Sequence, residues 1–448
     1  MHIYKRKIYD KLLDWKKNWS GKYAVLIEGA RRVGKSTVAE EFARREYRSY
    51  ILIDFLKTGD RYHEIFDHLD DLDYFFLNLQ QMARVQLYPR ESVIIFDEIQ
   101  FFPKAREAIK YLVADGRYDY IETGSLISIK KNVKNIQIPS EEKKIQMFPM
   151  DYEEFTWATG KNDVVPMLKL GFESKRPSDP HVFRQNMRDF RLYMLVGGMP
   201  QAVTTYLDTN NLKRVDDTKR TILDLYHDDF RKLDSSGRIN KLFDSIPSQL
   251  TSSSSSFSVA SILKGYKKED AADLLNDLED SKTVLISHNV TDPEVGFSAS
   301  EELSTFKFYV CDIGLFITMM FMDKDYTENI IYDKLLSDKM PANLGMLYEN
   351  MTAQMLAANG NKLYYHVFHA RDDTSEHEKK YEIDFLLSRK TKICPLEVKS
   401  SGYKTHASID MFSRKYSSRI GEKYLIYSKD YFRDGDVKCL PIYDVMFL

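Results

Sequence analysis

A glycine-rich loop between an apolar run and a helical pattern constrains the fold of this chain more than any other feature. Residues 23–37 read YAVLIEGARRVGKST and contain the spacing G-x-x-x-x-G-K-[ST] from Gly29 to Ser36. Glycines let backbone N–H groups surround phosphate oxygens, and the N-terminus of the following helix adds a favourable dipole. The pattern is specific when a strand precedes it and a helix follows it. It predicts a phosphate-binding loop; the alternative is a glycine-rich turn that matches by chance.

The side chains of this loop indicate which ligand it holds. Lys35 would reach the β- and γ-phosphates of a nucleotide, and the Ser36 hydroxyl would bind Mg²⁺. We therefore expect ATP and Mg²⁺ as cofactors. The expected nucleotide-binding residues are Gly29, Arg31, Arg32, Val33, Gly34, Lys35, Ser36 and Thr37.

A second motif, ESVIIFDEIQ at residues 91–100, supplies the acids that such a loop needs. Its four apolar residues predict a buried strand, which ends at Asp97 and Glu98. An acid at this strand end can complete the Mg²⁺ shell, and a neighbouring glutamate can polarise the attacking water. An acidic turn is the alternative for this motif alone. Together with Lys35, the two acids predict a catalytic site for nucleotide hydrolysis.

Short apolar runs and longer helical patterns alternate up to about residue 150. Helical patterns cover 36–47 and 103–115, where Pro103 suits a helix start. This alternation is typical of an α/β fold with a parallel sheet. The expected strands are 23–28, 50–55, 92–96, 118–123 and 145–148.

The strand YDYIETGS ends in two polar side chains, Thr123 and Ser125. In many ATPases of this build, a polar side chain at this strand end contacts the γ-phosphate and the attacking water. We assign that role to Ser125. The alternative is an ordinary turn at Gly124 and Ser125.

Composition excludes several classes of protein. The chain has 448 residues, enough for two to four domains, and 43% of them are hydrophobic. The net charge of −2 gives no global attraction to nucleic acid or acidic lipid. The three cysteines form no metal spacing or disulfide framework. No signal-peptide core is visible, and the apolar run at 314–322 is too short to span a bilayer, so we expect a soluble, cytoplasmic protein without a membrane partner.

Residues 150–235 change to a helical pattern interrupted by GGMP at 197–200. We expect a helical lid beside the nucleotide. Arg184, Arg188 and Arg191 can supply a charge-stabilising arginine, although surface arginines of helices are usually solvated.

A five-serine run at 252–256 precedes a helix, helix, strand order at 258–266, 267–281 and 283–290, which suggests a winged helix. Residues 267–282 carry six acids and three lysines. A helix that reads DNA should be basic, so a packing or partner-binding role is favoured.

The last 150 residues contain a second group of chemical side chains. KYEIDFLL at 380–387 predicts a strand containing Asp384, and KICPLEVKS at 392–400 predicts its hairpin partner. Alternation places Glu397 and Lys399 on one face. Carboxylates and a lysine on one sheet face can bind Mg²⁺ and stabilise an attacking hydroxide at a phosphodiester. The segment NLGMLYENMTAQMLAAN predicts an amphipathic helix carrying Glu349; exposed salt bridges are the alternative for the hairpin.

These motifs together resemble the prokaryotic AAA-type ATPases with a C-terminal domain of unknown function, relatives of the archaeal-type, STAND-like ATPases. The resemblance implies a P-loop NTPase sheet of the additional-strand type, a winged-helix middle domain and a C-terminal domain of the PD-(D/E)xK nuclease fold. It implies a second metal site at Glu349, Asp384 and Glu397 with Lys399, although EIDFLL lacks the literal Pro-Asp pair. The landmarks are GARRVGKST, VIIFDEIQ, IETGSLIS, MFPMDYEEF, LVGGMPQAV, FKFYVCDIGLF and YEIDFLL with CPLEVKSSG.

We therefore expect a Mg²⁺-dependent ATPase whose nucleotide state controls a nuclease-like domain. Two alternatives stay open: an ATP-gated nuclease that cleaves DNA or RNA, and a nucleotide-switched module that binds a nucleic acid or protein without nuclease chemistry. A homo-oligomer is compatible with all three. The expected domains are a P-loop core at 1–155, a helical lid at 156–235, a winged helix at 236–305 and a nuclease-like domain at 306–448.

Overall fold

The computed structural model describes residues 2–125, 137–251, 268–322, 335–336, 345–371, 377–400 and 405–448. They form two compact units. The first unit contains Met1–Met150 and Leu275–Thr283, and the second contains Asp151–Leu274 and Val284–Leu448. The boundaries of the four expected domains stay predictions. No helix in the described ranges combines the length and the apolar composition needed to cross a bilayer.

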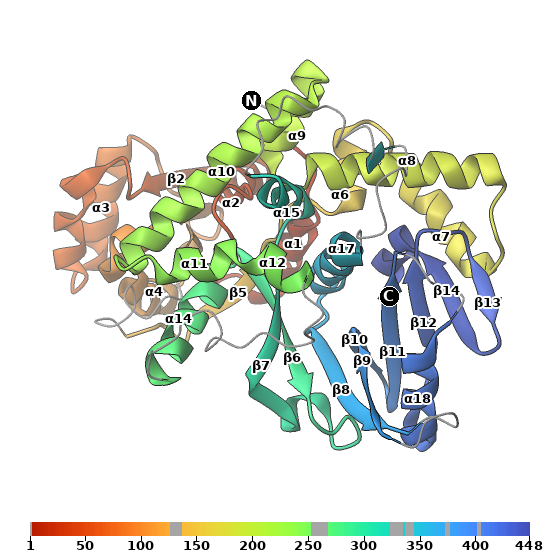
Figure 1. Ribbon diagram of the computed structural model, residues 1–448. Coiled ribbons are helices and arrows are strands. Elements are labelled where there is room, and N and C mark those ends of the chain that lie inside the picture. Colours follow the sequence, from red (N-terminus) through yellow and green to blue (C-terminus); the bar gives the residue numbers. More distant parts are fainter. Residues whose placement is uncertain are drawn as a thin grey trace. The chain divides into compact units, whose positions relative to one another are not determined.

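The first unit is built on a parallel sheet with the strand order β2-β3-β4-β1-β5. Two strands of this sheet, β2 and β5, are labelled in Figure 1. The expected α/β sheet is confirmed. β4 lies between β1, which precedes the glycine loop, and β3, which ends at Asp97. The additional-strand arrangement requires this order. The last strand begins three residues earlier than predicted. The strands are β1 (Ala24–Glu28), β2 (Ser49–Asp54), β3 (Ser92–Asp97), β4 (Asp119–Gly124) and β5 (Glu142–Gln146).

Helices cover this sheet, and aromatic side chains fill the space beneath them. All residues of β3 and β4 are buried, which explains why these strands read as continuous apolar runs. Phe66, Phe75 and Phe96 belong to the core on one side of the sheet. The helical elements are α1 (Ile8–Trp19), α2 (Lys35–Glu46), η1 (Gly59–Tyr62), η2 (Glu64–His68), α3 (Leu72–Ala83), η3 (Ile99–Phe101) and α4 (Pro103–Asp115).

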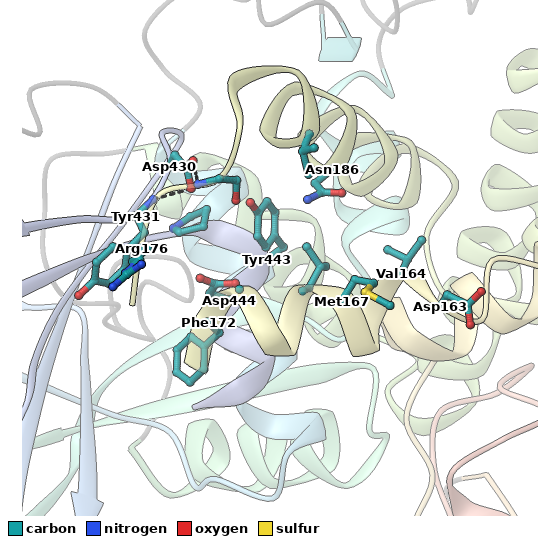
Figure 2. Close-up of a pocket in the computed structure, with 15 residues that line it drawn as sticks. Asp163, Val164, Met167, Phe172, Arg176, Asn186, Asp430, Tyr431, Tyr443 and Asp444 are labelled. Carbon is teal, nitrogen blue, oxygen red and sulfur yellow. Dashed lines mark hydrogen bonds between the residues drawn. The ribbon is translucent and has the colours of Figure 1, made fainter. Parts of the chain in front are cut away.

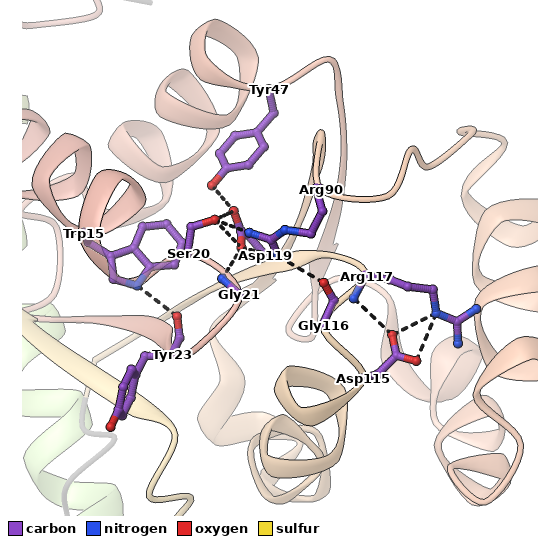
Figure 3. Close-up of polar contacts among 10 residues, drawn as sticks. All are labelled: Trp15, Ser20, Gly21, Tyr23, Tyr47, Arg90, Asp115, Gly116, Arg117 and Asp119. Carbon is purple, nitrogen blue, oxygen red and sulfur yellow. Dashed lines mark hydrogen bonds and ion pairs between the residues drawn. The ribbon is translucent and has the colours of Figure 1, made fainter.

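Asp119 fixes the amino end of β4 (Figure 3). Its carboxylate accepts hydrogen bonds from the Ser20 hydroxyl at 2.8 Å, the Gly21 N–H at 2.9 Å and the Tyr47 hydroxyl at 2.8 Å. Arg90 adds an ion pair at 3.2 Å. These partners come from the α1–β1 turn, the end of α2 and the loop before β3. The opposite, carboxyl end of β4 thereby keeps a fixed place beside the glycine loop.

The second unit begins with the helices expected between residues 150 and 235. Asp151 and Glu154 form a capping box at the start of α6. The helices are α6 (Tyr152–Ala158), α7 (Val164–Ser174), α8 (Pro180–Val196), α9 (Pro200–Thr209), α10 (Leu212–Leu233), α11 (Arg238–Asp244) and α12 (Ile246–Thr251).

Two sequence landmarks, GGMP and CDIG, meet in one buried junction. Gly197 ends α8 with φ +82°, and Gly314 lies in α15 (Ile313–Met320). A Cβ atom on Gly314 would lie 2.6 Å from the Gly197 Cα. The Asp312 carboxylate accepts the Gly198 N–H at 2.6 Å and the Leu315 N–H at 2.9 Å. Close backbone packing therefore requires the glycines of both motifs, Gly197 in GGMP and Gly314 in CDIG.

The middle region matches its predicted order where it is described. α14 (Lys268–Asp280) and β6 (Val284–Val290) coincide with the expected second helix and strand. The expected first helix at 258–266 and the serine run lie outside the described residues. β6 pairs antiparallel with β7 (Glu301–Val310) and parallel with β8 (Tyr364–Ala370), so the strand also joins residues from further along the chain. The winged helix stays a prediction.

The C-terminal region forms a second sheet with the order β10-β11-β12-β14-β13. The expected hairpin is confirmed, because β10 and β11 pair antiparallel around Arg389 and Lys392. The expected single strand at 380–387 is wrong. Asp384 divides it into β9, which pairs with β8, and β10. These elements are β9 (Lys379–Ile383), β10 (Phe385–Arg389), β11 (Lys392–Lys399), α18 (Ala407–Lys415), β12 (Lys423–Tyr427), β13 (Phe432–Asp434), β14 (Val437–Pro441) and η6 (Ile442–Phe447).

The helix that carries Glu349 is α17 (Gly345–Ala358), and the prediction that it is amphipathic is wrong. It is buried on nearly all sides because it packs against β7, β11, α15 and η6. Two of its polar residues, Asn350 and Gln354, bond to neighbouring backbone groups. The Asn350 amide accepts from the Val310 N–H at 2.8 Å and donates to the Val310 carbonyl at 3.0 Å.

Candidate nucleotide-binding site

The glycine loop has the backbone shape that a phosphate cradle requires. It begins where β1 ends and closes at the first residue of α2. Gly34 has φ +100°, a conformation that side chains disfavour. A Cβ atom on Gly29 would lie 2.3 Å from the Met147 carbonyl oxygen. Both glycines are therefore needed for the path of the loop, and the α2 N-terminus follows directly.

Lys35 folds back over the loop. Its ammonium donates to the carbonyl oxygens of Gly29 and Ala30, each at 2.9 Å, and the side chain is buried. Burial lowers the pKa of Lys35 to about 8, although the negative charges of Glu98 and Asp97 act to raise it. Phosphate oxygens are stronger acceptors for this ammonium than neutral carbonyls are. The side chain is thus placed to exchange its carbonyl bonds for phosphate contacts.

Asp97 joins the loop to the two central strands. The Ser36 hydroxyl donates to Asp97 Oδ1 at 2.6 Å, and the Thr123 hydroxyl at the end of β4 donates to the same oxygen. Hydroxyl and carboxylate oxygens are ligands that Mg²⁺ prefers, and the oxygens of Ser36 and Asp97 lie side by side. The two residues fit the predicted metal site. Sequence reasoning assigned a different role, contact with the γ-phosphate and the attacking water, to Ser125; this residue is buried two positions beyond Thr123, and its role stays a prediction.

Glu98 follows Asp97 in a left-handed conformation with φ +53°. The chain therefore turns at Glu98, directly after the last residue of β3. The Gln100 amide donates to Glu98 Oε2 at 2.5 Å and holds the carboxylate. Gln100 was not expected as a site residue, although it belongs to the DEIQ motif.

Arg6 is a further residue that the sequence did not reveal. Its guanidinium donates to the Val33 carbonyl at 2.8 Å and to the Phe148 carbonyl at 2.7 Å. It therefore connects the glycine loop to the segment after β5. A basic N-terminal segment carries no signal for such a contact, because carbonyl oxygens of any loop can accept it.

The other expected loop residues lie where the motif places them. Arg32 has φ +72°, Val33 is fully buried, and Thr37 is in the first turn of α2. Arg31 lies in the loop itself. Arg184, Arg188 and Arg191 lie on α8 of the second unit, and their proposed role stays a prediction.

The C-terminal carboxylates gather around a lysine that the sequence analysis missed. Lys307 on β7 forms an ion pair with Glu349 at 2.8 Å, a closer one with Glu382, and a third with Asp384 at 3.8 Å. The Tyr309 hydroxyl also donates to Glu349 at 2.6 Å. Burial lowers the pKa of Lys307, but these carboxylates outweigh it and raise the pKa well above its ordinary value. Lys307 thus serves as their buried counter-ion.

Asp384, Glu397 and Lys399, the predicted site residues of the hairpin, take part in two separate contacts. Asp384 Oδ2 accepts the Val398 N–H at 2.7 Å, which replaces a ladder bond and explains the break between β9 and β10. Lys399 pairs with Glu397 at 3.2 Å. Burial, and then Glu349, raise the pKa of Asp384. Among the residues that the structure describes, no group of three or more His, Cys, Asp or Glu side chains is arranged to hold a metal ion.

Three family models match separate parts of the chain. Residues 21–156 match an AAA domain, residues 187–326 match a domain of unknown function (DUF8612), and residues 344–445 match another (DUF4143). The first match and the strand order agree: residues 21–156 are similar to a P-loop domain of the AAA type. The other two models carry no function. No curated protein matches the chain.

Several solved structures resemble the chain at low sequence identity. A Walker-type ATPase of Pyrococcus abyssi is 17% identical, with 71% of this chain and 96% of that chain covered and a TM-score of 0.45. A STAND protein with a tetratricopeptide repeat sensor from Pyrococcus horikoshii is 12% identical, with 79% and 48% covered and a TM-score of 0.29. Cdc6p from Pyrobaculum aerophilum is 12% identical, with 75% and 96% covered and a TM-score of 0.27.

Proposed function

We propose that the first unit binds ATP with Mg²⁺ and hydrolyses it. The observation that carries this proposal is the convergence of Lys35, Ser36, Asp97 and Thr123 at the carboxyl ends of three adjacent strands. A polar edge of this kind, bordered by backbone N–H groups and a helix N-terminus, suits a triphosphate.

Each side chain has a distinct task in this proposal. Lys35 holds the β- and γ-phosphates, while Ser36 and Asp97 hold Mg²⁺, which when bound neutralises phosphate charge. Glu98 accepts the proton of the attacking water, and Gln100 orients Glu98. Thr123 keeps Asp97 in place. Ser125 stays a candidate for contact with the γ-phosphate.

Lys35→Ala tests the binding step. We expect the variant to bind ATP at least ~10-fold more weakly than wild type, because a charge-assisted hydrogen bond contributes ~1.5–3 kcal/mol. Calorimetry of the full chain with a slowly hydrolysed ATP analogue and Mg²⁺ measures the affinity. Lys110→Ala, an exposed lysine on α4, is the matched control and should bind as wild type does. Equal affinity of the Lys35→Ala variant and wild type would contradict the assignment.

We further propose that the nucleotide state controls the second unit. The chain passes between the units at 150/151, 274/275 and 283/284. Repeated covalent connection gives a change in the first unit a direct route to the second. The proposed consequence is nucleotide-dependent binding of a nucleic acid or protein, or self-association.

The contacts of Lys307 favour binding without nuclease chemistry for the C-terminal domain. Glu349 and Glu382 already have a buried cationic partner, which a metal ion would have to displace. We expect wild type to cleave DNA and RNA in Mg²⁺ or Mn²⁺ no faster than Asp384→Asn and Lys399→Ala do, with or without ATP. Gel assays with single- and double-stranded substrates measure this. Metal-dependent cleavage by wild type that both variants lose would establish the ATP-gated nuclease instead.

A further inference from the structure

A pocket of about 310 Å³ lies in the second unit, and its lining residues belong to neither of the groups discussed above (Figure 2). It is enclosed by α7, α8, the turn that joins them, the loop before β13, the end of β14 and η6. Its volume is at the lower end of the range for small-ligand sites. Its walls are mainly apolar side chains, including Leu168, Phe172 and Tyr443.

The carboxyl group of Asp444 lines this pocket without a partner. The residue is only 4% exposed, and within the described part of the chain nothing forms a hydrogen bond or ion pair with its side chain. The neighbouring Asp430 differs: its two oxygens accept the Ser178 N–H at 2.6 Å and the Tyr431 N–H at 2.7 Å. A buried polar group without a partner is costly, so the Asp444 carboxyl is the group in this pocket that a ligand would satisfy.

The electrostatics of the pocket select the charge of that ligand. The other ionisable groups that line it are Asp163 on the approach to α7, Asp430, Tyr431, Tyr443 and Arg176. The lining therefore contains three carboxyl groups and one guanidinium. Burial, and then Asp430, raise the pKa of Asp444 to about 8. Burial and Asp444 likewise raise the pKa of Tyr443. An anion would be repelled here, whereas a cation would stabilise the charged form of Asp444.

The rim of the pocket selects the rest of the ligand. Met167 is 63% exposed and Val182 is 52% exposed, and both line the opening. Exposed apolar side chains around a concave opening are typical of binding sites. They offer contacts to methylene groups that lead from solvent to the buried acid.

We propose that this pocket binds a cationic head group, an ammonium or guanidinium, carried on a short apolar stem. The head group pairs with Asp444, and the stem packs between Met167, Phe172 and Tyr443. This inference does not depend on ATP binding by the first unit. Both a free alkylamine and the side chain of a lysine or arginine from a partner protein have this chemistry.

Direct binding to the full chain tests the proposal with n-butylamine, butylguanidine and the neutral n-butanol as probes. Calorimetry should show that wild type at pH 8 binds the two cations at least ~10-fold more tightly than butanol. Asp444→Asn should remove this preference and leave butanol binding unchanged. Equal affinity of wild type for butylamine and butanol would overturn the proposal.

The pH dependence gives a second, independent reading on wild type alone. Below pH about 8, Asp444 must release its proton before it pairs with a cation, while a primary amine stays protonated. Affinity for butylamine should therefore rise by up to ~10-fold per pH unit towards pH 8 and then level off. Val182→Arg, at an exposed rim position, should block the pocket with its own guanidinium and leave thermal stability intact. A pH-independent affinity, or full binding by the Val182→Arg variant, would contradict the assignment.

Blocked peptides distinguish the two sources of the ligand. The tripeptide Ala-Lys-Ala and its norleucine counterpart differ only in the ammonium group. Tighter binding of the lysine peptide than of butylamine assigns the pocket to a partner protein, and the reverse order assigns it to a small amine. Equal binding of the lysine and norleucine peptides would count against the pairing with Asp444.

Discussion

Replacing Glu98 by glutamine (Glu98→Gln) is expected to leave the affinity for ATP unchanged and to lower its turnover by ~100-fold or more. Glutamine keeps the size and the hydrogen-bonding reach of the side chain but cannot accept a proton from water. The Gln100 amide donates to Glu98 at 2.5 Å, so the carboxylate is already held in one direction before any substrate arrives. A phosphate-release assay gives turnover, and calorimetry gives the affinity of the same preparation.

Two control variants make this result specific. Glu107→Gln changes an exposed acid on α4 and should hydrolyse ATP at the wild-type rate. Gln100→Ala removes the orienting bond but keeps the base, so we expect a smaller loss of turnover without a change in affinity. Wild-type turnover by Glu98→Gln would remove Glu98 from the proposed mechanism and leave the binding proposal standing.

The loop and the acidic strand end of the candidate nucleotide site could be predicted because the information for them is local. The residues from Gly29 to Ser36 specify a loop between a strand and a helix, and each neighbour constrains the next. Asp97 was predictable because a buried strand must end where charged residues begin. The contact between Thr123 and Asp97 was not predicted, and the assignment of Ser125 to the γ-phosphate stays a prediction. One or two residues decide which side chain reaches Asp97, and strand boundaries cannot be read from sequence with that accuracy.

Contacts between distant segments explain what sequence reasoning missed. Arg6 reaches carbonyl oxygens of Val33 and Phe148, and backbone acceptors leave no trace in sequence. Lys307 had a signal that could have been used. It stands between Phe306 and Phe308, in the half of β7 that is apolar, and a buried charge requires a partner of opposite sign. Searching for that partner would have led to Glu349.

The helix α17 shows how composition can mislead. The sequence predicted an amphipathic helix here, and the polar residues of this helix include Asn350 and Gln354. In the structure both side chains bond to buried backbone groups at the end of β7 and the start of α15. Polar residues in a helix thus indicate either solvent or unsatisfied backbone nearby, and the sequence alone does not distinguish these two cases.

Gly314→Ala is expected to lower the free energy of unfolding of the second unit by ~1–3 kcal/mol, as overpacking of a tight core does. The new methyl group would lie 2.6 Å from Gly197 Cα and 2.8 Å from the Val196 carbonyl oxygen. These are backbone atoms, so no side-chain rotation can relieve the contact. Movement of this segment would also disturb Lys219, whose ammonium donates to the carbonyls of Leu195 at 2.8 Å and Gly314 at 3.2 Å.

A matched glycine separates this packing effect from helix propensity. Gly171 also lies within a helix, α7, but a Cβ atom there would meet nothing within 4 Å. Gly171→Ala should therefore stabilise the unit by up to ~1 kcal/mol, the ordinary gain from alanine in a helix. Urea unfolding followed by pulsed hydrogen exchange, measured on peptides of α8 and α15, reports on the second unit separately from the first. Changes of the same sign in the two variants would show that the contact between Gly197 and Gly314 does not determine the outcome, whereas opposite signs assign GGMP and CDIG to backbone packing.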